Sequence, residues 1–144
     1  MSPLENRAWL TLWSMCPPYL VYFALQIVAP VWVARLTILE RFGLLAAAAI
    51  THAVVFVAGL LLLKHRERGE GPLADERDHA IDARATRSAY YALMAGAIVA
   101  GMVMPFGQTG WKIVNTMLLA IVLSEALRCV LTVTRYRGTL RLAQ

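Results

Sequence analysis

The stretch KHRERGEGPLADERDHAIDARATR, residues Lys64 to Arg87, decides how the rest of the chain is interpreted. It is the one long polar interruption in an apolar sequence. It holds six of the fourteen Lys and Arg residues and six of the nine Asp and Glu residues. The blocks before and after it are apolar and long enough to be typical of helices that cross a membrane.

The composition supports a membrane protein. The 144 residues are 59% hydrophobic and 16% charged, whereas soluble domains average about 45–50% apolar and about 25% charged residues. We predict an all-α integral membrane four-helix bundle, one membrane domain over residues 1–144. The predicted spans are 10–33, 42–63, 86–105 and 111–133, with a cytoplasmic loop at 64–85.

Proline and glycine residues predict where the helices bend or begin. Pro17 and Pro18 predict a bend or an irregular start near Cys16 in the first span. The first nine residues lack the layout of a signal peptide, so we expect this span to be a retained anchor. Gly69 to Pro72 should end the second helix, and Asp75 resembles a helix N-cap. We predict one helix from Asp75 to Met104, with its first three turns extended into the cytoplasm.

The basic residues predict the orientation of the chain. Four spans place both termini and the 64–85 loop on one side, together with 11 of the Lys and Arg residues, and leave 3 on the other side. Cytoplasmic loops carry the excess of Lys and Arg in membrane proteins. Both termini are therefore expected in the cytoplasm, and we attribute the pI of about 9.7 to topology rather than to nucleic-acid binding.

The predicted cytoplasmic helix separates its charges by face. Asp75, Asp78, His79 and Asp82 have the spacing i, i+3, i+4 and i+7, so they share one side, named here the acidic stripe. Arg77 and Arg84 lie nearly opposite. Neighbouring like charges destabilise a helix, and an acidic surface is repelled by an anionic inner leaflet. We therefore expect the acidic stripe to have a cationic partner.

Three partners for the acidic stripe remain open. Residues 64–68, the arginines of the C-terminal tail or a second subunit would cover it within the protein. A cytosolic protein would dock on it. A divalent ion would be ligated by its carboxylates and histidine. The predicted partner-binding residues are Asp75, Glu76, Arg77, Asp78, Asp82 and Arg84.

The same segment carries a family resemblance. Asp75-Glu76-Arg77-Asp78, followed by Ile81 and Arg84-Ala85 before an apolar helix, resembles the signature of an uncharacterised prokaryotic membrane-protein family. The resemblance covers about thirty residues, from Asp75 to Gly101. It implies a small bacterial or archaeal membrane protein and brings no established activity, so no catalytic role is carried over.

Five polar residues fall within or at the edge of the predicted spans, where such residues are costly and often functional. They are Gln26, His52, Asn115, Glu125 and Arg128. His52 would form an interhelical hydrogen bond, to Gln26 or Asn115, or would relay protons or bind a ligand. Glu125 and Arg128, three residues apart, would form a neutralised pair, or Glu125 would be a substrate or proton carboxylate.

These patterns favour a role without catalysis. We find no catalytic triad, phosphate-binding glycine loop, zinc spacing or haem-ligand pair, and expect no enzyme activity, cofactor or metal. The predicted function is an accessory or regulatory protein of the bacterial inner membrane, homodimeric through small-residue ridges, that presents residues 75–87 to a partner. The alternative is a small dimeric proton-coupled exporter that uses Glu125 and His52.

Overall fold

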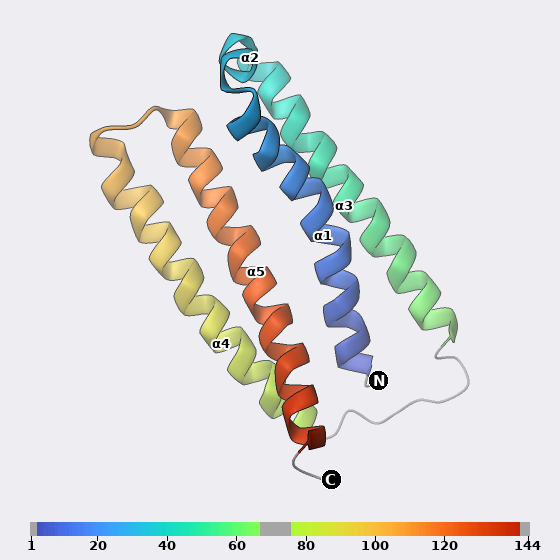
Figure 1. Cartoon of the computed structure of the whole chain (residues 1–144). Helices are drawn as coiled ribbons and strands as arrows, with labels where there is room; N and C mark the ends of the chain where they lie inside the picture. Colours follow the sequence, from blue (N-terminus) through green and yellow to red (C-terminus); the bar gives the residue numbers. More distant parts are fainter. Residues whose placement is uncertain (1–2, 67–75, 142–144) are drawn as a thin grey trace. The chain divides into compact units, whose positions relative to one another are not determined.

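The computed structural model describes the backbone of residues 3–66 and 76–141, and the side chains of 5–65 and 80–135. The predicted N-cap Asp75 lies outside these residues. The chain forms two compact units. We call Leu10–Gly71 the N-terminal unit and Pro72–Gln144, with Met1–Trp9, the C-terminal unit. Figure 1 shows the helices of each unit.

The N-terminal unit contains two long helices joined by a short one. Helix α1 covers Pro3–Val28, α2 covers Pro30–Arg35 and α3 covers Ile38–Arg66. The first residues of α1 belong to the C-terminal unit. In Figure 1, α1 and α3 run side by side in opposite directions, with α2 at the turn between them.

Helix α1 begins and ends elsewhere than predicted. It starts at Pro3 and stays helical through Pro17 and Pro18, so the helix has no irregular start near Cys16. It stops at Val28 because Pro30 disfavours a helical conformation in the residue before it, and Ala29 has a φ of −124° and a ψ of 52°. The last part of the predicted 10–33 span therefore lies in α2.

The turn before α3 is held by its own side chains. Thr37 precedes the helix, and its amide donates a hydrogen bond of 2.7 Å to the carboxylate of Glu40. The Glu40 amide donates in return to the Thr37 hydroxyl, at 3.4 Å. This reciprocal pattern is a capping box. Arg41 donates to the carbonyls of Ala34 and Leu36, which fixes the end of α2.

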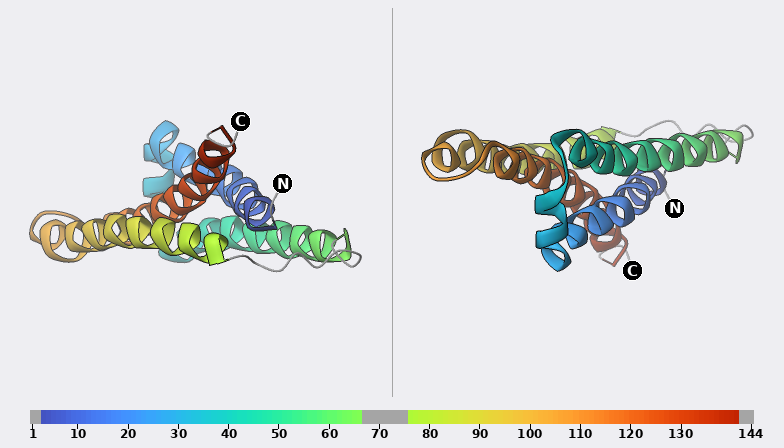
Figure 2. Two further views of the ribbon diagram at one scale, coloured as in Figure 1. Left: turned by 90° about the horizontal axis from the view of Figure 1, so that it is seen from below. Right: turned by 90° about the horizontal axis from the view of Figure 1, so that it is seen from above.

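The C-terminal unit is a helical hairpin. Helix α4 covers Glu76–Ile98 and continues as a π-helix over Val99–Val103 and a 3₁₀ turn over Met104–Phe106. Helix α5 covers Gly110–Arg141. The hydrogen-bond pattern changes before Pro105 because proline lacks an N–H group and its ring crowds the carbonyl four residues earlier. Figure 2 gives two further views of this hairpin.

Small residues let α4 and α5 approach closely. A Cβ atom on Gly96 would lie inside van der Waals contact of the Ala120 Cβ atom and 3.5 Å from the Ala120 Cα atom. Ala100, one turn after Gly96, is also buried. Gly96 belongs to one of two small-residue ridges of this helix, Ala92, Gly96 and Ala100, and it packs on α5 within the chain. The homodimer stays a prediction.

Four helices of the described residues are long and apolar enough to cross a membrane. They are Glu5–Val28, Ile38–His65, Ala80–Phe106 and Gly110–Arg135. Each overlaps one predicted span, and none has more than 22% of its apolar window buried within the protein. Large apolar side chains therefore cover most of the outer surface of these helices.

Candidate functional site

The predicted partner-binding residues lie at the start of α4. Glu76, Arg77 and Asp78 form its first turn, and their side chains, with the whole of Asp75, lie outside the described residues. The described side chains begin just before Ile81, which is buried. Asp82 follows it and is partly exposed, and Arg84 is exposed on the other side of the helix. The start of α4 thus has a packed side and an outward side.

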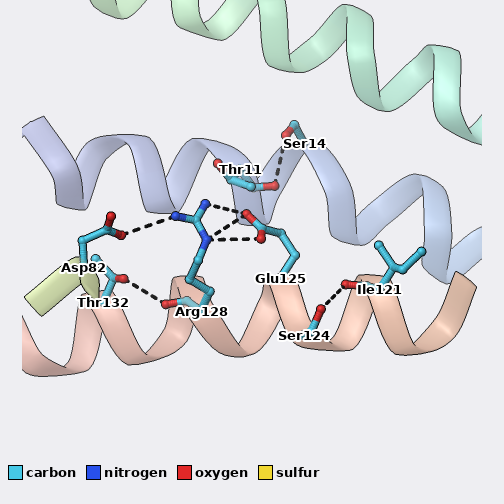
Figure 3. A network of polar contacts seen from close by, with 8 residues as sticks. All are labelled: Thr11, Ser14, Asp82, Ile121, Ser124, Glu125, Arg128 and Thr132. Carbon is cyan, nitrogen blue, oxygen red and sulfur yellow. Dashed lines mark hydrogen bonds and ion pairs between the residues drawn. The ribbon is translucent and has the colours of Figure 1, made fainter. Parts of the chain in front are cut away.

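Arg128 of α5 joins the two acidic groups of this region (Figure 3). Its Nη2 atom donates to the Glu125 carboxylate at 2.6 Å, and its Nε atom donates to both oxygens of that carboxylate at 3.2 Å. Its Nη1 atom donates to Asp82 Oδ1 at 3.4 Å. The guanidinium therefore binds Glu125 on its own helix and Asp82 on α4.

This arrangement uses the planar fork of arginine. One guanidinium offers five N–H groups in fixed directions, so it can bond two carboxylates at once, which a lysine ammonium does with less geometric control. The three side chains are 34% exposed for Arg128 and Glu125 and 42% exposed for Asp82. Solvent access makes the contact weaker than a fully buried pair, and its main effect is to orient α4 on α5.

The polar residues beside Arg128 have their partners on the same helix. The Ser124 hydroxyl donates to the Ile121 carbonyl, and the Thr132 hydroxyl donates to the Arg128 carbonyl, both at 2.9 Å (Figure 3). Both residues are buried. Such hydroxyls satisfy their own hydrogen bonds and offer no donor to a ligand. The charged contacts between α4 and α5 in this region are those of Asp82, Glu125 and Arg128.

The outward side of α4 carries two arginines with no ion pair to any residue that the structure describes. Arg84 and Arg87 are both exposed. Asp82 lies almost opposite Arg84, because residues two positions apart in a helix are rotated by about 200° about its axis. Tyr90 and Tyr91 follow within one turn and are also exposed. The sequence singled out Arg84 here and did not single out Arg87 or the two tyrosines as parts of one surface.

The predicted polar residues of the N-terminal unit are held by aromatic neighbours. The His52 ring makes edge contacts with Tyr19 and Phe56, at centroid distances of 5.8 Å and 6.2 Å. It makes no hydrogen bond to any residue in the described part of the chain. Gln26 follows Tyr22 by one turn on the same helix and is half-buried. Asn115 lies in the C-terminal unit, where it is half-buried and has a polar partner.

An apolar groove of about 500 Å³ runs along α1 and α3 within the N-terminal unit. Trp13, Pro17 and Leu44 are among the side chains that line it. Two of its hydroxyl groups are bonded to the backbone, since Ser14 donates to the Thr11 carbonyl and Thr51 to the Ala47 carbonyl. The lining is mainly apolar, so the groove can accommodate hydrocarbon.

Metal ligands do not gather in the part of the chain that the structure describes. No group of three His, Cys, Asp or Glu side chains is close enough there to hold an ion. The residues of the metal interpretation other than Asp82 lie outside the described side chains, so that interpretation stays a prediction. A search against family models, curated proteins and solved structures finds no match to this chain, and the family resemblance of the Asp75–Ala85 motif remains a prediction.

Proposed function

We propose that this chain is a four-span protein of the bacterial cytoplasmic membrane with a non-enzymatic, accessory or regulatory role. Both termini lie in the cytoplasm, and the start of α4, residues 76–87, extends there to meet a partner protein. The acidic stripe binds a cationic segment of that partner. This role needs no cofactor or metal.

The exposure of the apolar helices supports membrane insertion. Only 6% of the apolar window of α3 is buried within the protein. Ile50, Val54, Leu61 and Leu62 on this helix are all more than 60% exposed. Contiguous apolar surface of this extent is unfavourable in water and is typical of a membrane or protein interface. In a membrane, lipid would cover this surface.

The contact between Asp82 and Arg128 carries the proposal about the partner. Asp82 is the only acid of the acidic stripe whose side chain the structure describes, and its partner is an arginine. If the helix predicted from the sequence begins at Asp75, Asp78 and Asp75 would precede Asp82 by one and two turns on the same side. The same chemistry that binds Arg128 to Asp82 would bind Lys or Arg side chains of a partner farther along the stripe.

The polar contacts favour this role over the exporter. A carboxylate that binds a proton or a substrate during transport needs oxygen atoms that are accessible to it. Glu125 accepts three hydrogen bonds from Arg128. His52 packs against Tyr19 and Phe56 in the other unit. If the wild type carries a proton-coupled flux that Glu125→Gln abolishes, the exporter function would be supported instead.

Site-specific crosslinking tests the partner. A photocrosslinking amino acid at Thr86, which is exposed and follows Asp82 by one turn on the same side of α4, should give a protein adduct that the same probe at the buried Ala85 does not give. The double variant Asp75→Asn with Asp78→Asn should remove the adduct. A matched variant, Glu67→Gln with Glu70→Gln, removes the same charge and should keep it.

Membrane insertion is measured on the same samples by carbonate extraction. All variants should remain in the membrane fraction, because the substituted acidic residues lie outside the predicted spans. A Thr86 adduct that persists in the Asp75 and Asp78 double variant would show that the acidic stripe is not the docking surface. Extraction of the wild-type chain by carbonate would contradict the membrane assignment itself.

A further inference from the structure

The outward side of α4 forms a second surface, of opposite charge to the acidic stripe. Arg84, Arg87 and Tyr91 are spaced i, i+3 and i+7, so they lie along one line of the helix. All three are exposed. The line continues through Met94, Ile98 and Met102, which are 41%, 49% and 67% exposed. We call these six residues the α4 lipid stripe.

We propose that the α4 lipid stripe binds one anionic phospholipid of the cytoplasmic leaflet. The headgroup phosphate lies between the guanidinium groups of Arg84 and Arg87, and one acyl chain follows Met94, Ile98 and Met102. The inference rests on the membrane insertion proposed above and goes beyond the protein partner, because it concerns the opposite side of α4.

Charge supports a phosphate as the ligand. Neither guanidinium has an ion pair or a side-chain hydrogen bond with the residues that the structure describes. The nearest acid on the helix, Asp82, is turned away and bonded to Arg128. Two arginines with unused N–H groups, three residues apart, match the oxygens of a phosphate, which arginine binds in a bidentate manner.

The length of the stripe supports a lipid rather than free phosphate. From Tyr91 to Met102 the helix rises about 16 Å, at about 1.5 Å per residue. One leaflet of the hydrocarbon core is about 15 Å thick, half of the usual bilayer value. Tyrosine is enriched at the boundary between headgroups and hydrocarbon. The order of arginines, tyrosine and apolar residues therefore matches the order of groups in one phospholipid molecule.

The side chains of the apolar part suit an acyl chain. Met94 and Met102 have unbranched, flexible side chains that adapt to an irregular hydrocarbon surface. Gly101 lies beside this line, and a Cβ atom there would meet nothing within 4 Å. The opposite side of the helix is occupied, since Ala89 and Ala100 are buried and Gly96 packs on Ala120. The lipid therefore has one open side of α4 to bind.

Native mass spectrometry of the full-length chain in mild detergent tests the inference. The protein is titrated with phosphatidylglycerol and with phosphatidylcholine of identical acyl chains. Wild type should retain phosphatidylglycerol preferentially. Each arginine near an anionic lipid surface strengthens binding by about fivefold, so Arg84→Gln with Arg87→Gln should reduce the preference by about 25-fold.

A matched double variant controls for net charge. Arg35→Gln with Lys112→Gln also removes two exposed cations, both outside α4, and should keep the wild-type preference. Millimolar inorganic phosphate should fail to displace the lipid. Displacement by phosphate, without any effect of acyl-chain length on binding, would identify a phosphate site and overturn the lipid inference.

Other outcomes separate this inference from the proposed function. Equal retention of the two lipids by the wild type, or an equal preference in the two double variants, would overturn the lipid stripe while leaving the membrane assignment intact. Loss of a protein adduct in the Arg84 and Arg87 variant, with lipid preference unchanged, would show that this side docks a protein. Extraction of the wild type by carbonate would contradict membrane insertion, which belongs to the proposed function and on which the lipid inference rests.

Discussion

The close contact between α4 and α5 at Gly96 gives the sharpest prediction for stability. Gly96→Ala places a methyl group against the Ala120 methyl group, inside van der Waals contact. Neither methyl can rotate away, because each is attached directly to a backbone Cα atom. Ordinary contact between such atoms is 3.4–4 Å. The helices must therefore separate locally by about 1 Å, the kind of backbone shift that follows overpacking.

The expected cost follows from this displacement. Overpacking of a well-packed contact costs about 1–3 kcal/mol, or about 5- to 150-fold in the equilibrium constant for unfolding. A radial gap of about 1 Å also forfeits up to about half of the dispersion energy of neighbouring contacts. Alanine in place of glycine gains about 1 kcal/mol of helix propensity, which acts in the opposite direction. A control variant must therefore measure that gain separately.

Two other helical glycines supply the controls. A Cβ atom on Gly43 would meet nothing within 4 Å, so Gly43→Ala reports helix propensity alone. A Cβ atom on Gly59 would meet the terminal methyl groups of Leu10, which can move to another rotamer. We expect the free energy of unfolding to fall most for Gly96→Ala, less for Gly59→Ala and not at all for Gly43→Ala.

The assay is unfolding by sodium dodecyl sulfate from mild-detergent micelles, followed by circular dichroism. Adding Ala120→Gly to Gly96→Ala moves the methyl group across the interface and should restore most of the lost stability. A double-mutant cycle measures this coupling. Equal stabilities for Gly96→Ala and Gly43→Ala, or no recovery in the double variant, would refute the close contact.

Three further changes have expected outcomes. Thr37→Val removes the N-cap of α3 and should speed hydrogen exchange in its first turn about fivefold, as lost N-caps generally do, whereas Thr51→Val should not. N-ethylmaleimide should modify the half-buried Cys16 more than about tenfold faster than Cys129, which is 1% exposed, since Cys129 reacts only after local opening. Arg128→Lys keeps the charge but loses the planar guanidinium. In the same unfolding assay, the free energy of unfolding should fall by more than the about 1 kcal/mol of an exposed ion pair and by less than the about 3–5 kcal/mol of a buried one. Equal exchange in both threonine variants, equal thiol reactivity or a wild-type stability for Arg128→Lys would contradict these expectations in turn.

Hydropathy and the helix-breaking proline and glycine residues predict most of the helical pattern, because helix formation and helix ends depend on local sequence. The predicted spans 42–63 and 111–133 lie within α3 and α5. The first span is less accurate at both ends. Helix α1 starts at Pro3, before the predicted start at residue 10, and Pro30, inside the predicted span, separates α1 from α2. The capping box Thr37-x-x-Glu40 was readable from sequence and marks the start of α3.

Contacts between helices could not be predicted from the sequence, because they depend on how two helices are aligned. Glu125 and Arg128 are three residues apart, so their pairing follows from helical geometry. Asp82 is 46 residues from Arg128, and its part in the cluster requires the register of α4 against α5. The small-residue ridge through Gly96 has the same limitation. Its composition predicts close packing but does not identify the helix on the other side.

The cluster at Arg128 links the two surfaces of α4. Asp82 and Arg84 lie on nearly opposite sides of the helix, so a bond that turns Asp82 toward α5 necessarily turns Arg84 outward. The one contact therefore orients both Asp82, the acid of the acidic stripe whose side chain is described, and the α4 lipid stripe. A partner that drew Asp82 away from Arg128 would have to leave Arg128 bound to Glu125 alone and allow α4 to rotate. Protein binding on one side and lipid binding on the other would then be coupled through a single arginine, with a coupling free energy that acts equally in both directions.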